Sequence, residues 1–123
     1  MAVRVGLDLV EVEDVREAIR IYGDLYLDRI YTDAERFATR SDPVRLAARF
    51  AAKEATMKAL GRGDEPLPWL SIAVRQGPAG APSLELSGAA AALARVRGVR
   101  SLALSVTQRR SHAAAVVIAE IER

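Results

Sequence analysis

Several residue types and patterns are missing from this chain of 123 residues, and each absence excludes a class of protein or site. No cysteine is present, which excludes disulfides, thiolate nucleophiles and cysteine-ligated zinc or iron–sulfur centres. No run of about 18 apolar residues occurs, so the sequence predicts no membrane-spanning helix. The N-terminus also lacks the basic region and long apolar stretch of a signal peptide. Together these absences predict a cytoplasmic protein.

The chain also lacks a strong excess of either charge. It has 18 basic and 16 acidic residues, a net charge of +2, which is too small an excess to indicate a nucleic-acid partner. The arginines nevertheless occur in local groups, which could contact phosphates or an acidic protein, or form an ordinary solvated surface. These groups are Arg40, Arg45 and Arg49; Arg95, Arg97 and Arg100; and Arg109 and Arg110.

Aromatic residues are scarce, at 5%, whereas alanine is abundant. A core of Ala, Val and Leu buries little area per residue, and a domain of this size hides only about two-thirds of the surface of its unfolded chain. A second subunit would therefore help to stabilise the protein. Length alone predicts one domain, residues 1–123.

The hydrophobic pattern predicts an α+β fold, because strands and helices are mixed along the chain without strict alternation. Alternating or β-branched runs indicate strands, and apolar residues repeating every three to four positions indicate helices. Thr32 and Glu35 form a capping box that starts a short helix, and the last two strands form a closing hairpin. The predicted strands are 3–10, 69–75, 83–86, 99–107 and 112–121, and the predicted helices are 12–22, about 24–30, one from Thr32, 43–60 and 87–97.

Glu54 is the first candidate functional residue, because it lies within the apolar stripe of the predicted helix 43–60. Steps of four and three residues place it on the same side as Phe50 and Met57. A carboxylate on a buried face is unfavourable unless it is ion-paired or binds a cation. A salt bridge to Lys58, one turn on, is the simpler interpretation and would contribute only about 0.2–0.5 kcal/mol.

Asp8 raises the same question, because it interrupts the predicted strand 3–10. It shares a face with Gly6, which leaves space for a ligand to approach the backbone. Pairing with an arginine is again the simpler interpretation. The alternate face carries Val3, Val5, Leu7 and Leu9.

Considered together, Asp8 and Glu54 suit a hard cation. Magnesium commonly takes one or two carboxylates, waters and substrate phosphate oxygens. Arg49, Lys53 and Lys58 could then neutralise the phosphate. The pair therefore indicates phosphate-ester chemistry as an alternative to simple ion pairing.

Two motifs in the sequence resemble those of the holo-acyl-carrier-protein synthases. The stretch VGLDLVEV, which contains Asp8, is similar to the family's opening G-[IVL]-D-[IVL]-V-E. The stretch ARFAAKEATMKALG, which contains Glu54, is similar to its helical signature R-F-A-x-K-E-A-x-x-K-A, at a similar spacing. Later segments, PWLSIAV, GAPSLELSG and LALSVTQRRSHAAAVVIAE, resemble the family's strands in order, so the resemblance covers nearly the whole chain.

The resemblance implies a 4'-phosphopantetheinyl transferase fold, a small antiparallel sheet packed with helices, one of them long and central. It also implies an activity that requires Mg²⁺ and uses coenzyme A as co-substrate. The enzyme would transfer the 4'-phosphopantetheine moiety to a serine of an apo acyl carrier protein, as in fatty acid and lipid biosynthesis, and release adenosine 3',5'-bisphosphate. Family members are homotrimers with active sites between subunits, and the same assembly is implied here.

The resemblance also assigns roles to individual residues. Asp8 and Glu54 would bind Mg²⁺, and Lys58 would bind the pyrophosphate and assist the leaving group. Glu54 is also the best candidate for the base that deprotonates the serine. The coenzyme would be contacted by Arg49, Lys53, Lys58, Gly61, Pro82, Thr107, Gln108 and Arg109.

The chain departs from the family in the strand 99–107 and just after it. Where the family has histidine in S-[LIV]-[ST]-H, this chain has Gln108, which can donate a hydrogen bond but carries no charge. The change could weaken coenzyme binding by about 1–2 kcal/mol, and Arg109 could compensate. The single histidine, His112, is displaced from that position, and we interpret it as structural.

A second departure concerns the first helix, which the resemblance implies as the docking surface for an acidic carrier protein. Arg16 and Arg20 are four residues apart and could form a basic stripe, with Tyr26 packing against the carrier. Acidic residues occupy the same region. They are Glu11, Glu13, Asp14 and Glu17.

Three questions stay open at the level of sequence. The carrier could belong to a fatty acid, polyketide or peptide pathway. Gln108 is compatible with a non-catalytic relative that only binds coenzyme A or a nucleotide. The acidic residues could also be merely ion-paired in a structural protein.

Overall fold

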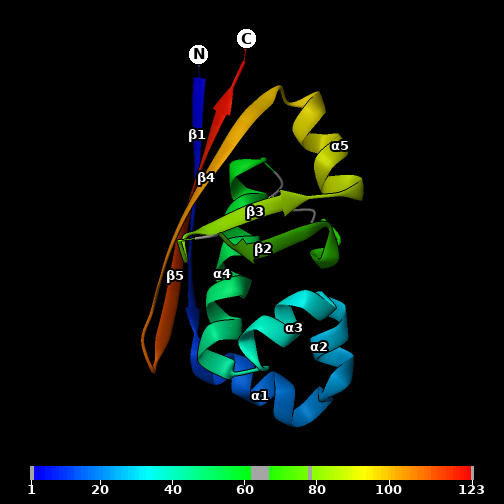
Figure 1. Cartoon of the computed structure of the whole chain (residues 1–123), viewed down its shortest axis with the longest axis vertical. Coiled ribbons are helices and arrows are strands. Elements are labelled where there is room, and N and C mark those ends of the chain that lie inside the picture. The colour runs from blue at the N-terminus through cyan, green and yellow to red at the C-terminus, as the bar shows by residue number, and fades with distance from the viewer. Residues whose placement is uncertain (1, 62–66, 78, 123) are drawn as a thin grey trace.

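The computed structural model describes residues 2–61, 67–77 and 79–122, and it has the predicted α+β class (Figure 1). One predicted boundary differs by three residues. The predicted strand 69–75 begins only at Ile72, because Trp69–Ser71 form a short 3-10 helix, η1. The other elements, in chain order, are β1 (Ala2–Glu11), α1 (Val12–Tyr22), α2 (Asp24–Ile30), α3 (Asp33–Thr39), α4 (Pro43–Ala59), β2 (Ile72–Gln76), β3 (Pro82–Leu86), α5 (Gly88–Val96), β4 (Val99–Gln108) and β5 (His112–Ile121).

The three long strands form an antiparallel sheet in the order β1-β5-β4, and β2 and β3 form a separate two-stranded sheet. β4 and β5 make the predicted closing hairpin, with Gln108 opposite Ala113. β1 pairs with β5 from Ala2 opposite Ile121 onward, so the two ends of the chain lie side by side (Figure 1). α4 runs beside the long sheet, with α1, α2 and α3 at one end and α5 at the other.

Local signals fix where the helices begin. Thr32 and Glu35 form the predicted capping box at the start of α3, each side chain bonding to the other's backbone N–H. Asp42 accepts a hydrogen bond from the backbone N–H of Arg45, and Pro43 occupies the first turn of α4. The position of α4, which carries most of the candidate site, is therefore fixed at its N-terminus by sequence.

Small residues let β1 approach α4 closely. Buried alanines recur every four residues along one face of the helix, at positions 47, 51, 55 and 59. A Cβ atom on Gly6 would collide with the backbone carbonyl of Ala55, so only glycine permits this approach. Asp8, two residues further along the same face of β1, is thereby brought beside α4.

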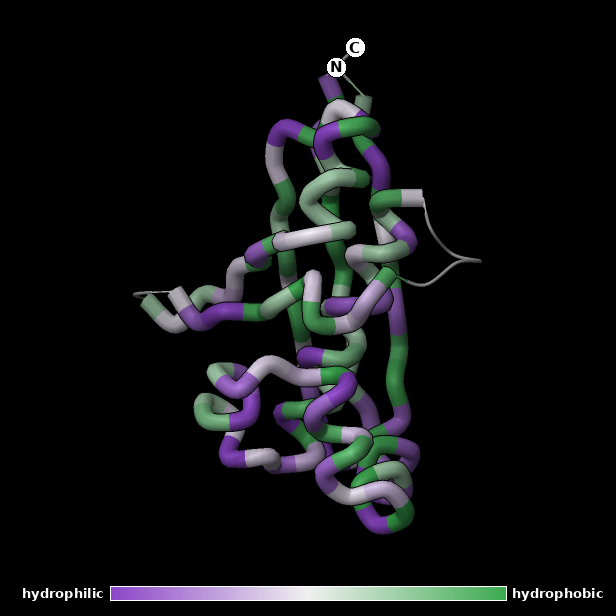
Figure 2. The backbone as a smooth tube through the Cα atoms, turned by 90° about the vertical axis from the view of Figure 1, so that its right-hand side faces the viewer, coloured by the Kyte–Doolittle hydropathy of each residue, from purple (hydrophilic) through white to green (hydrophobic). Residues whose placement is uncertain are grey.

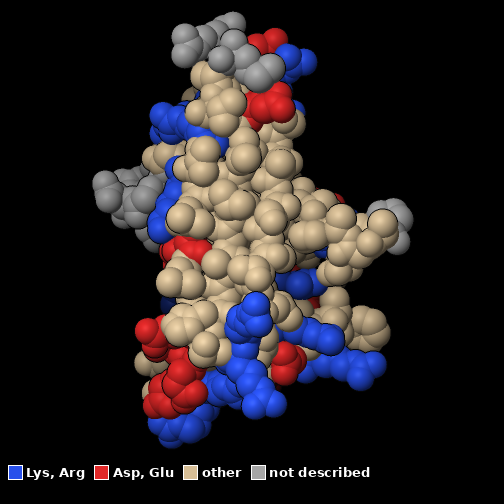
Figure 3. Space-filling view, turned by 90° about the vertical axis from the view of Figure 1, so that its left-hand side faces the viewer, with Lys and Arg blue, Asp and Glu red and all other residues tan. Residues whose placement is uncertain are grey.

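The opposite face of β1 is apolar and uncovered. The exposed fraction is 56% for Val3, 60% for Val5, 64% for Leu7 and 67% for Leu9, although their alternation is that of a half-buried strand. Ile118 of β5 continues the same surface. Figure 3 views the molecule from the sheet side, and charged residues are largely missing from its middle. The sheet thus has one face packed on helices and one apolar face that no other described segment covers.

The core lies between the long sheet and α4, and a second cluster joins the end of α4 to α5. Figure 2 shows hydrophobic residues recurring along the long strands and through the middle of the molecule, with the β2–β3 hairpin projecting from the body. Within the described ranges, none of the helices combines the length and the apolar character that crossing a membrane requires.

Candidate active site

Asp8, Glu54 and Lys58 lie together where β1 crosses α4. Lys58 donates from Nζ to the Asp8 Oδ1 atom at 3.0 Å and to the backbone carbonyl of Leu7 at 3.0 Å. The ammonium group therefore pairs with Asp8, fifty residues away in sequence, instead of with Glu54 on its own helix. Among the described residues, neither of the simple pairings considered for these acids is present: Glu54 does not pair with Lys58, and Asp8 does not pair with an arginine.

Glu54 carries a carboxylate in an unfavourable setting. Burial raises the pKa of Glu54, the nearby charge of Asp8 raises it further, and Lys58 partly offsets both effects. Among the described residues, no ion pair or hydrogen bond engages the Glu54 side chain. A second carboxylate close enough to disfavour the charge of Glu54 favours a cation between the two groups.

The chemistry of these side chains fits magnesium. The described part of the chain contains no group of three or more His, Cys, Asp and Glu side chains that could hold a metal ion. Magnesium does not need such a cage, because it keeps several waters and is usually bound by one or two carboxylates together with phosphate oxygens. Asp8 and Glu54 are the residues that would hold it.

Arg49 belongs to a second polar site, on another side of α4. It lines a hollow of about 380 Å³ together with Arg45, Gln76 and Gln108, and with Ala38 and Thr39 of α3. The Nε atom of Arg49 is buried and has no hydrogen-bond partner among the described residues. Burial lowers the pKa of Arg49, Glu35 raises it, and Arg45 lowers it. A buried, unsatisfied guanidinium nitrogen beside a second arginine fits an anion.

Three other predicted coenzyme residues, Pro82, Thr107 and Arg109, adjoin residues that line this hollow. Pro82 pairs with Gln76 across the β2–β3 hairpin, so it lies beside the hollow. Thr107 is exposed near the end of β4, and Arg109 is exposed in the turn that follows. Arg109 donates its backbone N–H to the His112 carbonyl and so closes the β4–β5 turn.

His112 and Gly61 lie outside the hollow. The His112 ring bonds to the Ser111 hydroxyl at 2.9 Å on the surface. Gly61 ends α4 with a φ of +81°, a backbone conformation that favours glycine. The sequence grouped Arg45 with Arg49 as a possible phosphate contact, one helical turn apart, but it assigned Arg45 no role in the coenzyme site and gave no signal for Gln76.

The two polar sites are separated within one chain. Arg49 and Glu54 are five residues apart on α4. This spacing places their side chains about 140° apart around the helix axis. Gln108 lies on β4 and Asp8 lies on β1, and these strands are the two edges of the sheet. Because β5 lies between them, β4 and β1 are about 10 Å apart. The acidic site and the arginine site therefore face different directions.

Lys53 departs from the expectation that it contacts the coenzyme. Its side chain is completely buried, and its Nζ donates to Glu35 Oε1 at 2.7 Å and to the Trp69 carbonyl at 3.2 Å. Glu35 in turn accepts from the backbone N–H groups of Thr32 at 2.9 Å and Val74 at 3.0 Å. Burial lowers the pKa of Lys53, and Glu35 partly offsets this. We interpret Lys53 as the centre of a buried network joining α3, α4, η1 and β2.

The arginines expected to dock a carrier protein are engaged on their own helix. Arg16 pairs with Glu13 at 3.8 Å, and Arg20 pairs with Glu17. The Tyr26 hydroxyl is hydrogen-bonded to the hydroxyl of the buried Tyr31 at 2.8 Å, and one side of Tyr26 lines a hollow beside α2. Arg16 and Arg20 therefore do not form an uncompensated basic stripe.

Comparison with known proteins shows the family of this chain. Residues 4–117 match the sequence model of the 4'-phosphopantetheinyl transferase superfamily. The chain belongs to this family. It is 42% identical over 124 residues to the holo-[acyl-carrier-protein] synthase of Koribacter versatilis, covering 98% of this chain and 99% of that protein. The resemblance drawn from the two motifs is thus confirmed, and the protein is an enzyme of the phosphopantetheinyl transferase class.

Solved structures of relatives agree with the fold of the transferase. The synthase of Chronobacterium ammoniagenes in complex with coenzyme A has a TM-score of 0.88 and 27% identity, with 100% of both chains covered. The synthase of Helicobacter pylori in complex with coenzyme A has a TM-score of 0.85 and 26% identity, covering 94% of this chain and 99% of that one. The predicted fold class is therefore confirmed.

Proposed function

We propose that the transferase moves 4'-phosphopantetheine from coenzyme A to a serine of an apo acyl carrier protein, with Mg²⁺, and releases adenosine 3',5'-bisphosphate. The observation that carries this proposal is the grouping of Asp8, Glu54 and Lys58, two carboxylates and an ammonium group from distant parts of the chain. The names of the relatives support the same reaction, since they are holo-[acyl-carrier-protein] synthases and two of their structures contain coenzyme A.

The reaction requires a proton acceptor and a stabiliser of developing charge. The carrier serine Oγ forms a bond to the β-phosphorus of coenzyme A, and the bond from that phosphorus to the bridging oxygen breaks. Glu54 takes the serine proton, a role suited to a carboxyl group whose pKa is raised by burial. Lys58 stabilises the charge that grows on the phosphate oxygens. Bound Mg²⁺ would add Lewis-acid stabilisation of the same oxygens.

The arginine site would hold the nucleotide end of coenzyme A. Arg49 and Arg45 offer guanidinium groups to a phosphate, and Gln108 contributes a hydrogen bond from β4. In this arrangement the charge that a histidine would bring at position 108 comes from the arginines of α4. The other proposed contacts of the coenzyme remain Gly61, Pro82, Thr107 and Arg109. Lys53 acts only indirectly, by holding in place the elements that carry the coenzyme contacts.

A homotrimer with active sites between subunits is part of the proposal. The uncovered face of β1 and β5 is a surface that another copy would bury. The acidic and arginine sites face different directions in one chain, so a neighbouring copy would bring the arginine site of one subunit to the acidic site of the other. A cytoplasmic location also belongs to the proposal and rests on the cysteine-free composition.

The reaction is tested by intact-mass spectrometry of an apo acyl carrier protein after incubation with the transferase, coenzyme A and Mg²⁺. We expect the carrier to gain the mass of one phosphopantetheine arm, and the gain to vanish with EDTA or with the Glu54→Gln variant. An exposed-pair variant, Arg75→Met, serves as the matched control and should retain full activity. No mass gain with wild-type protein across fatty acid, polyketide and peptide carriers would contradict the proposed reaction.

A further inference from the structure

Two arginine side chains from distant parts of the chain meet at the end of α4. Gly61 follows this helix, and a Cβ atom added to it would collide with the Nη1 atoms of Arg4 and Arg97. Arg4 lies near the start of β1, and Arg97 lies at the end of α5. Glycine at position 61 therefore permits both guanidinium groups to pack over the end of α4, and it also adopts the positive φ found there.

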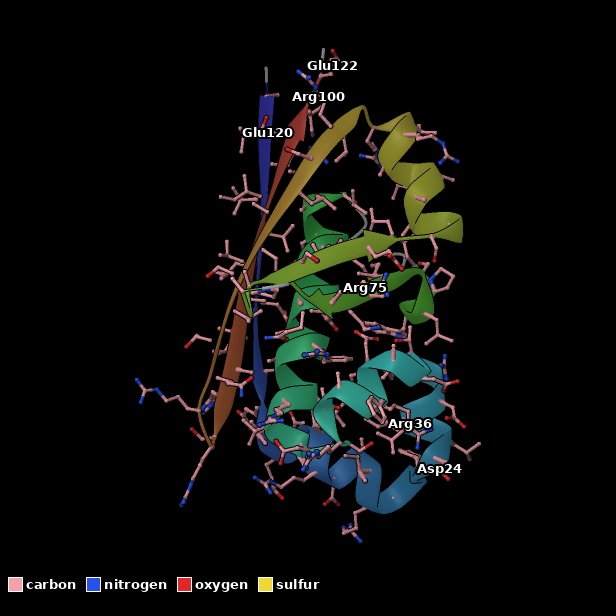
Figure 4. The ribbon with its side chains drawn as sticks, in the orientation of Figure 1. Asp24, Arg36, Arg75, Arg100, Glu120 and Glu122 are labelled. Carbon is pink, nitrogen blue, oxygen red and sulfur yellow. The ribbon has the colours of Figure 1, made fainter. Side chains whose placement is uncertain are left out.

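This Arg4–Arg97 pair brings two like charges together. Both Nη1 atoms approach the same point above the end of α4, so the guanidinium groups are neighbours. Glu120 and Glu122 lie at this end of the molecule, where Figure 4 labels them. Within the described ranges, neither acid forms an ion pair with the two arginines. Two neighbouring guanidinium groups fit an anion that carries more than one negative charge.

The negative end of the α4 dipole explains only part of this arrangement. The last carbonyl groups of a helix attract a cation, but the attraction is weak when the side chain is exposed, as Arg4 and Arg97 both are. Among the described residues, no side-chain hydrogen bond joins either arginine to a carbonyl of α4. A second cation at the same helix end is repelled by the first. The helix end alone therefore does not account for two arginines.

The Arg4–Arg97 pair lies next to the acidic site along the contact between β1 and α4. Arg4 and Asp8 are four residues apart, which places them on the same face of β1, about 13 Å apart along the strand. Gly61 follows Lys58 by three residues, a rise of about 4.5 Å along α4. A ligand held between Asp8 and Lys58 can therefore extend along α4 to the two guanidinium groups.

We propose that the Arg4–Arg97 pair binds the α-phosphate of coenzyme A and stabilises the leaving group. The inference rests on the proposed function, which places the β-phosphate at Asp8, Glu54 and Lys58. When the bond from the β-phosphorus to the bridging oxygen breaks, its electron pair stays on that oxygen, and the serine proton goes to Glu54. The α-phosphate thereby gains one negative charge, and the two guanidinium groups stabilise it.

The Arg4–Arg97 pair is distinct from the arginine site, which contains Arg45 and Arg49 and faces another direction. In the proposed trimer a neighbouring copy supplies the arginine site, whereas the Arg4–Arg97 pair belongs to the same chain as Glu54. Adenosine 3',5'-bisphosphate has one phosphate for each of them. The arginine site takes the 3'-phosphate, and the Arg4–Arg97 pair takes the 5'-phosphate, so two subunits hold the leaving group.

The first test is binding of adenosine 3',5'-bisphosphate, measured by isothermal titration calorimetry without carrier protein. The double variant Arg4→Gln/Arg97→Gln should raise Kd about tenfold or more, because it removes two charge-assisted contacts. Arg4→Lys/Arg97→Lys, which keeps the charges, should recover part of the affinity. Arg100→Gln is the matched control, since Arg100 is exposed at the same end of the molecule (Figure 4) and is not among the side chains nearest to Gly61. Its Kd should change less than about twofold.

Kinetics separate a role in the reaction from a role in the fold. In the glutamine double variant, kcat/KM for coenzyme A should fall about tenfold or more, whereas KM for the carrier stays unchanged. Its Tm without ligand should match that of Arg100→Gln, and the rise in Tm caused by the bisphosphate should shrink. A lower Tm with unchanged Kd and unchanged kcat/KM would overturn the proposal and leave the two arginines as a cap of α4.

Two further outcomes separate this inference from the proposed reaction. Loss of bisphosphate affinity in the glutamine double variant, without phosphopantetheine transfer by the wild type, would mean that the site stands and the proposed reaction fails. Transfer that is insensitive to both substitutions would mean the reverse. Inorganic phosphate is the control ligand. Weaker binding of inorganic phosphate in the double variant, with the bisphosphate unaffected, would overturn the assignment to the leaving group.

Discussion

At Glu54 the chain keeps a carboxylate where burial and the charge of Asp8 both disfavour ionisation. Such a residue is understandable if a bound cation relieves the repulsion during function, since active sites often retain groups that do not stabilise the fold. Asp8 has Lys58 as a partner at 3.0 Å, whereas Glu54 has none among the described side chains. Removing the charge of Glu54 should therefore raise the stability of the metal-free protein and abolish the activity of the protein with metal.

We predict that Glu54→Gln is more stable than the wild type at neutral pH in EDTA, by a few degrees in Tm, although it is inactive. Because the folded-state pKa of Glu54 lies above the usual 4.5, the wild type loses stability as the pH rises through that raised pKa. Below the usual value both states are protonated and the advantage of the variant should disappear.

The measurement is thermal unfolding of both proteins at matched concentration from acid to neutral pH. Excess Mg²⁺ should reduce the difference or reverse its sign. A wild type that is as stable as Glu54→Gln at neutral pH in EDTA would show that Glu54 is not under electrostatic strain.

At the scale of elements, the buried pair of Lys53 and Glu35 joins α3, α4, η1 and β2. Glu35 caps α3 and accepts from Val74 of β2, while Lys53 reaches from α4 to the carbonyl of Trp69, the first residue of η1. The pair also lies close enough to Arg49 for the charge of Glu35 to raise the pKa of that arginine. It thus sets the position of the helix that carries both polar sites.

Lys53→Met should destabilise the protein by about 3 kcal/mol, because the substitution leaves the Glu35 carboxylate buried without its cation. Adding Glu35→Gln should recover part of the loss, since the amide keeps the bond to Thr32 and removes the charge. Urea unfolding with unchanged m-value is the measurement. The control is Arg75→Met, which breaks the exposed pair with Glu85 and should lower the stability by no more than about 1 kcal/mol. An equal loss of stability in Lys53→Met and Arg75→Met would contradict the assigned role of Lys53.

At the scale of the whole molecule, the main question is how the acidic site and the arginine site act on one coenzyme. They lie on opposite edges of the sheet and on different sides of α4. The uncovered apolar face of β1 suggests that assembly, not a change of fold, brings them together. Function and stability would then depend on the same interface.

We predict that Glu54→Gln and Arg49→Ala are each inactive alone and that co-assembled mixtures of the two regain activity. In a randomly mixed ring, roughly a quarter of the interfaces would combine an intact Glu54 with an intact Arg49 of the neighbour. The measurement is carrier modification after denaturing and refolding the variants together, with each refolded separately as control. No recovery in the mixture would place both residues in the same active site of one chain.

The sequence by itself determined the family, the order of the elements and the residues of the acidic site. These depend on local patterns: a glycine and an acid in one strand, fixed spacings on one helix, and caps at helix starts. The tertiary structure decided that Lys58 pairs with Asp8, that Lys53 is buried against Glu35, and that the apolar row of β1 faces outward. Each of these depends on which distant segments pack together, and an alternating strand has the same pattern whichever face is covered.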